Sequence, residues 1–96
     1  TRGDLVVGLP GEQLLDSLAV DGAGHVCVAT IRNGGISDID PADGSVVHVP
    51  TGDPLTTNIC FGGPDMTTAY ITCSLSGTLK VTTWARPGLK LNFNPY

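Results

Sequence analysis

The sequence predicts an all-β protein made of about two four-stranded antiparallel sheets that stack as neighbouring propeller blades. Leu14–Thr30 and Thr57–Cys73 each read as an apolar strand, a glycine-rich turn and a second apolar strand. The two copies start about forty residues apart, a spacing typical of propeller blades. Helical periodicity is absent, and turn signals recur about every ten residues. With 13 Gly, 7 Pro and 41% hydrophobic residues in 96, the composition suits a turn-rich β domain.

The first blade is expected at about residues 14–50. Its strands are predicted at Leu14–Asp21, His25–Ile31, Ile36–Asp40 and Ser45–Val49. Turns rich in Gly, Asn and Pro separate them, because Gly tolerates positive φ and these residues favour tight reversals. Both faces of the second strand are apolar, so we expect both to be covered. Turn spacing alone would also suit a sandwich, but the repeat and this strand favour blades.

The second blade is expected at about residues 56–93, so the whole chain, 1–96, is predicted to be a partial propeller. Its strands are predicted at Thr57–Phe61, Thr68–Cys73, Thr78–Trp84 and Leu89–Phe93. The last shows clean alternation of apolar and polar residues, typical of a half-covered outer strand. Before the first blade, the apolar run Leu5–Leu9 ends at Pro10-Gly11 and reads as the outer strand of a preceding blade or as a linker.

Two blades alone are a small unit. A chain of this length buries only about 60–65% of its unfolded surface, and an isolated pair of blades leaves two apolar outer faces in water. We therefore expect either a homo-oligomer or the remainder of a longer propeller as the partner of these faces.

Charge and hydropathy exclude some classes of function. The net charge is −4, from 9 acidic and 5 basic residues, and no basic cluster suits a phosphate backbone, so no nucleic acid partner is expected. No run approaches the ~20 apolar residues of a membrane span, and the N-terminus does not resemble a signal peptide, so no membrane association is expected.

The cysteines point to a reducing compartment. Cys27, Cys60 and Cys73 each fall inside an apolar strand, without a CxxC pair or a His at metal-finger spacing. Buried free thiols are expected, which places the protein in the cytoplasm. A Cys60–Cys73 disulfide is the alternative, since both residues fall on neighbouring strands.

Asp16 is the main candidate for chemistry. It falls at the start of the expected innermost strand, where strand ends open onto the channel of a propeller and a carboxylate can bind a hard cation. The alternative is that Asp16 caps a local turn. The other acids, Asp21, Asp38, Asp40, Asp43 and Asp65, read as strand ends and turns, and His25 and His48 read as surface residues without a visible partner. No GxSxG nucleophile elbow is present.

Three stretches resemble a known family: DSLAVDGAGHVCVA, NGGISDIDPADG and TTNICFGGPDMTTAYITC. Together they look like the C-terminal third of the SMP-30/gluconolactonase/LRE-like family, over about residues 12–84. The resemblance implies a six-bladed propeller with one divalent cation, calcium or zinc, in its channel, and hydrolysis of a small-molecule lactone. It places Asp16 on a family Asp that is a metal ligand and a candidate general base. The Glu and Asn ligands of the family have no counterpart in this chain.

Two functions follow as hypotheses. The first is the C-terminal part of a metal-dependent lactonase. The alternative is a non-catalytic, propeller-derived module that self-associates or binds a partner. Three copies could close a ring and place three Asp16 carboxylates around one axis.

Overall fold

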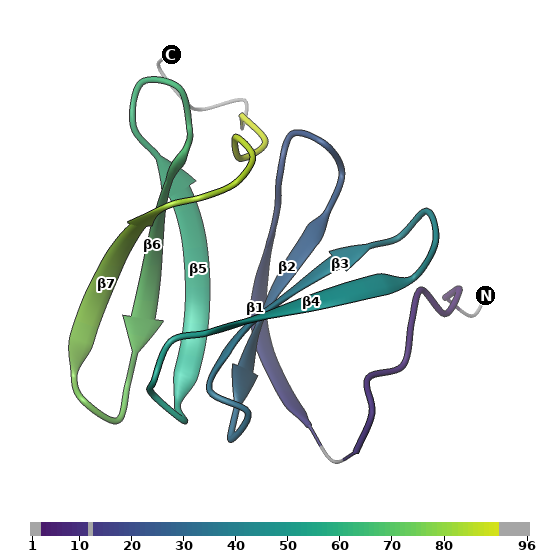
Figure 1. Cartoon of the computed structure of the whole chain (residues 1–96), viewed down its shortest axis with the longest axis horizontal. Helices are drawn as coiled ribbons and strands as arrows, with labels where there is room; N and C mark the ends of the chain where they lie inside the picture. Colours follow the sequence, from purple (N-terminus) through teal and green to yellow (C-terminus); the bar gives the residue numbers. More distant parts are fainter. Residues whose placement is uncertain (1–2, 12, 91–96) are drawn as a thin grey trace.

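The computed structural model describes residues 3–11 and 13–90, which form two antiparallel β-sheets (Figure 1). In each sheet every strand pairs with the next strand along the chain. The first sheet contains β1 (Leu14–Val20), β2 (Val26–Ile31), β3 (Gly35–Asp40) and β4 (Ser45–Pro50). The second contains β5 (Thr56–Gly62), β6 (Thr68–Cys73) and β7 (Thr78–Thr83). The predicted all-β class is confirmed, and the seven predicted strands that lie within the described ranges match these elements to within about two residues.

Glycines make the predicted reversals. Gly24, between β1 and β2, has a φ of 86°, and Gly63, between β5 and β6, has a φ of 87°. Residues with a Cβ rarely adopt this conformation, so glycine lets each pair of strands join through a short turn. No helix long and apolar enough to cross a membrane occurs in the ranges that the structure describes.

The core lies between the two sheets, where β5 packs against β1 and β2. Its buried members are small or branched side chains with one indole. They are Cys27, Ala29, Ile36, Ile59, Ala69, Ile71, Cys73 and Trp84. On the opposite face of β2, Val28 is buried as well. The prediction that both faces of this strand are covered is therefore confirmed.

The crossing between the sheets is held by a buried acid. Asp53 Oδ1 accepts the Leu55 N–H at 2.8 Å, and Oδ2 accepts the N–H and the hydroxyl of Ser76 at 2.9 and 2.8 Å. Burial opposes ionisation, but the hydrogen bonds from Ser76, Leu55 and Leu75 outweigh it and hold the pKa of Asp53 below its ordinary 3.8. A linker carboxylate thus fastens the β6–β7 turn to the crossing.

The chain after β7 leaves the second sheet and returns to the first. Gly88 forms an isolated bridge with Asp21, and the Leu89 N–H donates to the Val20 carbonyl at 3.0 Å. Leu89 and Lys90 are not in a strand, and the rest of the outer strand predicted at Leu89–Phe93 lies outside the described residues. The described part of this stretch instead contacts the end of β1. Leu5–Leu9 forms no strand either.

Candidate functional site

Asp16 lies inside β1, next to an irregularity of the strand. The β1–β2 register shifts between Leu15 and Leu18, which places Asp16 in a β-bulge. Its side chain is exposed and forms no hydrogen bond or ion pair with any residue in the described ranges. The alternative role, in which Asp16 caps a local turn, has no such hydrogen bond to support it. Bulges often redirect a side chain beside a functional site, so Asp16 remains the predicted ligand.

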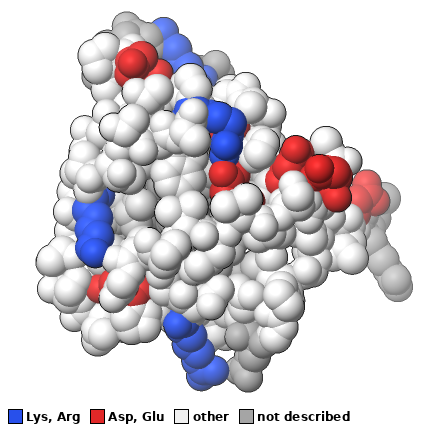
Figure 2. Space-filling view, in the orientation of Figure 1, with Lys and Arg blue, Asp and Glu red and all other residues white. Residues whose placement is uncertain are grey.

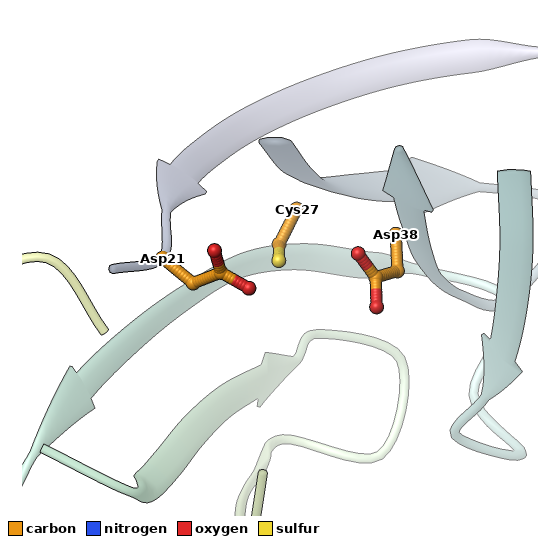
Figure 3. Close-up of side chains that lie close together, drawn as sticks. All are labelled: Asp21, Cys27 and Asp38. Atoms are coloured by element: carbon orange, nitrogen blue, oxygen red, sulfur yellow. The ribbon is translucent and has the colours of Figure 1, made fainter. Parts of the chain in front are cut away.

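A second group of polar side chains gathers at the other end of β1. Asp21 follows the strand, Cys27 lies on β2 and Asp38 lies on β3. One donor atom from each lies within 4.8 Å of the others. Figure 3 shows the Cys27 thiol between the two carboxylates, which both point toward the space beside it.

Arg86 joins the two carboxylates of this group. Its Nε donates to Asp21 Oδ2 at 2.5 Å, and its Nη2 donates to Asp38 Oδ2. Arg86 reaches them because the segment after β7 runs beside the β1–β2 turn, where the Gly22 N–H donates to the Pro87 carbonyl at 2.7 Å. Arg86, which follows the last strand of the second sheet in the chain, therefore neutralises two acids of the first sheet.

Asp21 is the most buried acid of this network. The residue is 1% exposed, and its Oδ1 accepts the N–H groups of Ala23 and His25, each at 2.9 Å. Burial opposes its ionisation, but Arg86 and these backbone donors hold the pKa of Asp21 below its ordinary 3.8. The predicted turn role of Asp21 is correct, and the sequence did not reveal its second role as the partner of Arg86.

His25 extends the network toward solvent. Its Nδ1 lies 2.8 Å from Asp38 Oδ1, and its Nε2 lies 3.7 Å from Asp40 Oδ2. The prediction that His25 is a surface residue without a partner is wrong, because β2 and β3 bring it beside two acids that are far from it in sequence. Asp38, predicted as part of a strand end, is nearly buried and pairs with both His25 and Arg86.

The thiol of Cys27 is held in its protonated form. Burial, followed by the charges of Asp38 and Asp21, raises its pKa to about 12. A protonated thiol is a poor nucleophile near neutral pH. Since the guanidinium of Arg86 already binds both carboxylates, the donors of this group do not fit a divalent cation.

The other cysteines differ from the prediction in part. Cys73 is buried as expected, but Cys60 is exposed. Cys60 pairs with Tyr70 and Cys73 pairs with Thr56, near opposite ends of the β5–β6 ladder. The alternative of a Cys60–Cys73 disulfide is therefore wrong, and both thiols are free.

The network should make stability depend on pH in the acid range. The folded-state pKa of Asp21 is depressed, so its contribution is fully present above the ordinary value of 3.8 and is lost as the pH falls through the lower folded value. We expect the free energy of unfolding to fall steeply below about pH 4, when measured by urea denaturation at a series of pH values. In Asp21→Asn this slope should be shallower, and an unchanged slope would contradict the assignment.

The charged side chains on the face of the molecule drawn in Figure 2 are dispersed. Figure 2 shows small, separate groups of acidic and basic side chains on a mostly uncharged surface. Neither sign forms a broad patch on the face shown.

Comparison of the sequence with known proteins identifies the family of this chain. The sequence model described as "SMP-30/Gluconolactonase/LRE-like region" matches residues 2–75. The chain is 34% identical over 67 residues to regucalcin from Pongo abelii, and 33% identical over 69 residues to regucalcin from Homo sapiens. Regucalcin from Xenopus laevis is 34% identical over 67 residues. Each match covers 69% of this chain but 22% of the relative.

Two paired sheets with a repeated strand–turn–strand unit define the class, a partial β-propeller. The chain belongs to the SMP-30/gluconolactonase/LRE-like family. It spans about a fifth of the length of the regucalcins that it matches.

Proposed function

We propose that this chain supplies the C-terminal part of a metal-dependent lactonase that hydrolyses a sugar lactone or a related ester. One observation carries the proposal: Asp16 is an exposed, unpartnered carboxylate in a β-bulge, inside the region that matches the family. A carboxylate that no described residue neutralises is available to a ligand, whereas Asp21 and Asp38 are not.

In this proposal Asp16 is one ligand of a divalent cation, calcium or zinc, and the candidate general base. Its oxygen donors fit a hard cation in kind. They do not fit in number, because calcium takes about six to eight oxygens, so further oxygen donors are needed to complete the site. A cation bound there would polarise the lactone carbonyl.

A second candidate function is a non-catalytic module that self-associates or binds a partner. The observation that favours it is the apolar surface outside the core: Leu18, Leu79 and Val81 are each more than half exposed. Exposed groups of this kind mark interaction surfaces. Under either function, the cytoplasmic location stays a prediction.

The two functions differ in what Asp16→Ala should do. In a full-length protein that contains this segment, we expect the change to reduce calcium- or zinc-dependent hydrolysis of gluconolactone to the background rate, because a charged ligand is lost. The thermal melt should not change, since Asp16 has no described partner. Chelation with EDTA should reproduce the loss, and added metal should reverse it only in the unaltered protein.

Asp4→Ala is the matched control. Asp4 is also an exposed acid, and its removal changes the net charge equally. Full activity in Asp16→Ala would remove this residue from the site. Equal losses in both variants would indicate a nonspecific charge effect.

A further inference from the structure

The two sheets differ in their number of strands. The first has four, and the second has three within the described ranges. Among the residues that the structure describes, β7 forms one edge of the second sheet, and all six of its residues are exposed. An edge strand presents unpaired N–H and C=O groups, so it can accept another strand.

One segment of the chain, residues 6–10, has the sequence pattern of an outer strand. This segment does not form a strand. Val6-Val7-Gly8-Leu9-Pro10 repeats the pattern of Val46-Val47-His48-Val49-Pro50, with Val, Val and Pro at equal positions and Leu in place of Val. The second of these segments is β4, the outer strand beside β3. Each is followed after a few residues by the first strand of a sheet, β1 or β5. By this correspondence, residues 5–10 are built to pair as an edge strand.

Within the described ranges, residues 5–10 pair with no strand. Leu5 is 86% exposed and Val6 is 55% exposed, although both are large apolar residues. Figure 1 shows the N-terminal segment beside the β3–β4 end of the first sheet, whereas β7 lies on the far side of the second sheet. Both sheets separate the segment from β7 of its own chain.

The chain beyond β7 leads away from the free edge. The Trp84 N–H donates to the Thr67 carbonyl at 2.7 Å, and Gly88 already bridges to Asp21 of the first sheet. The described part of the C-terminal segment therefore crosses to the first sheet and does not run back along β7.

We propose that residues 5–10 of one copy pair with the free edge of β7 in a second copy and complete its second sheet. The same step sets the first sheet of the incoming copy against the outer face of that second sheet. The register places uncharged side chains on this face, and two of them, Leu79 and Val81, are exposed large apolar residues that the contact would cover. The uncharged side chains are Asn58, Cys60, Tyr70, Thr72, Leu79 and Val81.

Such a contact is head-to-tail, because the donor segment and the acceptor edge are different parts of the chain. Head-to-tail contacts close into a ring when the rotation between copies divides a full turn. We expect a ring of discrete mass. A ring of three copies would have a mass of about three times 9.9 kDa. It would bring three Asp16 carboxylates together. The assembly is measured by mass, so its test is separate from the test of lactone hydrolysis.

Light scattering coupled to size-exclusion chromatography tests the assembly, with Val6→Pro as the critical variant. Proline removes a backbone N–H and should break pairing to β7, so the mass should fall to that of one chain. Gly3→Pro is the matched control, since Gly3 precedes the repeated segment and has no atom within 4 Å of an added Cβ. Far-ultraviolet circular dichroism should show a folded β protein in all three cases, with Val6→Pro losing only the contribution of the donated strand.

Crosslinking identifies the partner of β7 directly. Copies carrying Val6→Cys are mixed with differently tagged copies carrying Val81→Cys, both in a Cys60→Ser background, and treated with a short bismaleimide. We expect a crosslink between unlike copies. Adding Val6→Pro to the acceptor chain should not abolish it, because the donor segment of the acceptor chain is not involved. A monomeric unaltered protein, an assembly that Val6→Pro leaves intact, or no crosslink between unlike copies would each overturn the proposal.

Discussion

Arg86→Met is expected to lower the free energy of unfolding by about 3–5 kcal/mol, the cost of leaving buried charges without their partner. Asp21 has a fully buried carboxylate, the Asp38 side chain is 10% exposed, and Arg86 binds both. The Met side chain keeps most of the apolar stem but none of the donors. Since a small domain has only about 5–15 kcal/mol of stability, urea denaturation should detect the loss clearly.

Lys90→Met provides the control, because it removes the same charge from an exposed position. Surface changes of this kind usually alter stability by no more than about 0.5 kcal/mol. Combining Arg86→Met with Asp38→Asn should recover part of the loss, since one uncompensated charge is then removed. An Arg86→Met protein that unfolds at the same urea concentration as the unaltered chain would show that solvent, and not Arg86, compensates the two acids.

The strands could be predicted because their signals are local. Alternating apolar residues identify a strand within a few positions, and glycine at positive φ identifies a turn such as that at Gly24. The double burial of β2 was also predictable, since a strand that is apolar on both faces must be covered on both. None of these inferences needs knowledge of which strands face each other across the core.

The buried network could not be predicted for the same reason. Arg86 lies 65 residues from Asp21 and 48 residues from Asp38, and no spacing rule connects them. His25 follows a turn and reads as a surface residue until the β2–β3 pairing brings it beside Asp38. One signal was available: Arg86 is a single cation in a segment that otherwise lacks charge between Lys80 and Lys90. An isolated Arg of this kind is a candidate for pairing with acids, but the sequence does not say which.

The network and the C-terminal segment act together as a connection between the sheets. Arg86 binds acids of the first sheet, Pro87 accepts the Gly22 N–H, and Gly88 donates to the Met66 carbonyl at 2.8 Å. One short segment thus contacts the β1–β2 turn and the β5–β6 turn. Because the hydrogen bonds of Pro87 and Gly88 reach different sheets, the segment should fix their relative position, and any change that moves its backbone should weaken both contacts.

Gly88→Ala tests that connection by volume and leaves the charges unchanged. A Cβ on Gly88 would overlap the Cβ and ring of Phe61, and Phe61 packs against Trp84 with ring centroids 6.1 Å apart. The Phe61 Cβ cannot rotate away, so the segment must shift. Overpacking of this kind costs about 1–3 kcal/mol, which thermal melts should show as a lower midpoint.

Gly3→Ala is the control for the added methyl group, since nothing lies within 4 Å of its Cβ position. A double-mutant cycle with Phe61→Ala then assigns the cause. Removing the ring should reduce the cost of Gly88→Ala, because the added methyl then meets only the Cβ. If the cost is the same with and without the ring, the overlap with the Cβ of residue 61, which Phe61→Ala retains, sets the cost, and the ring does not.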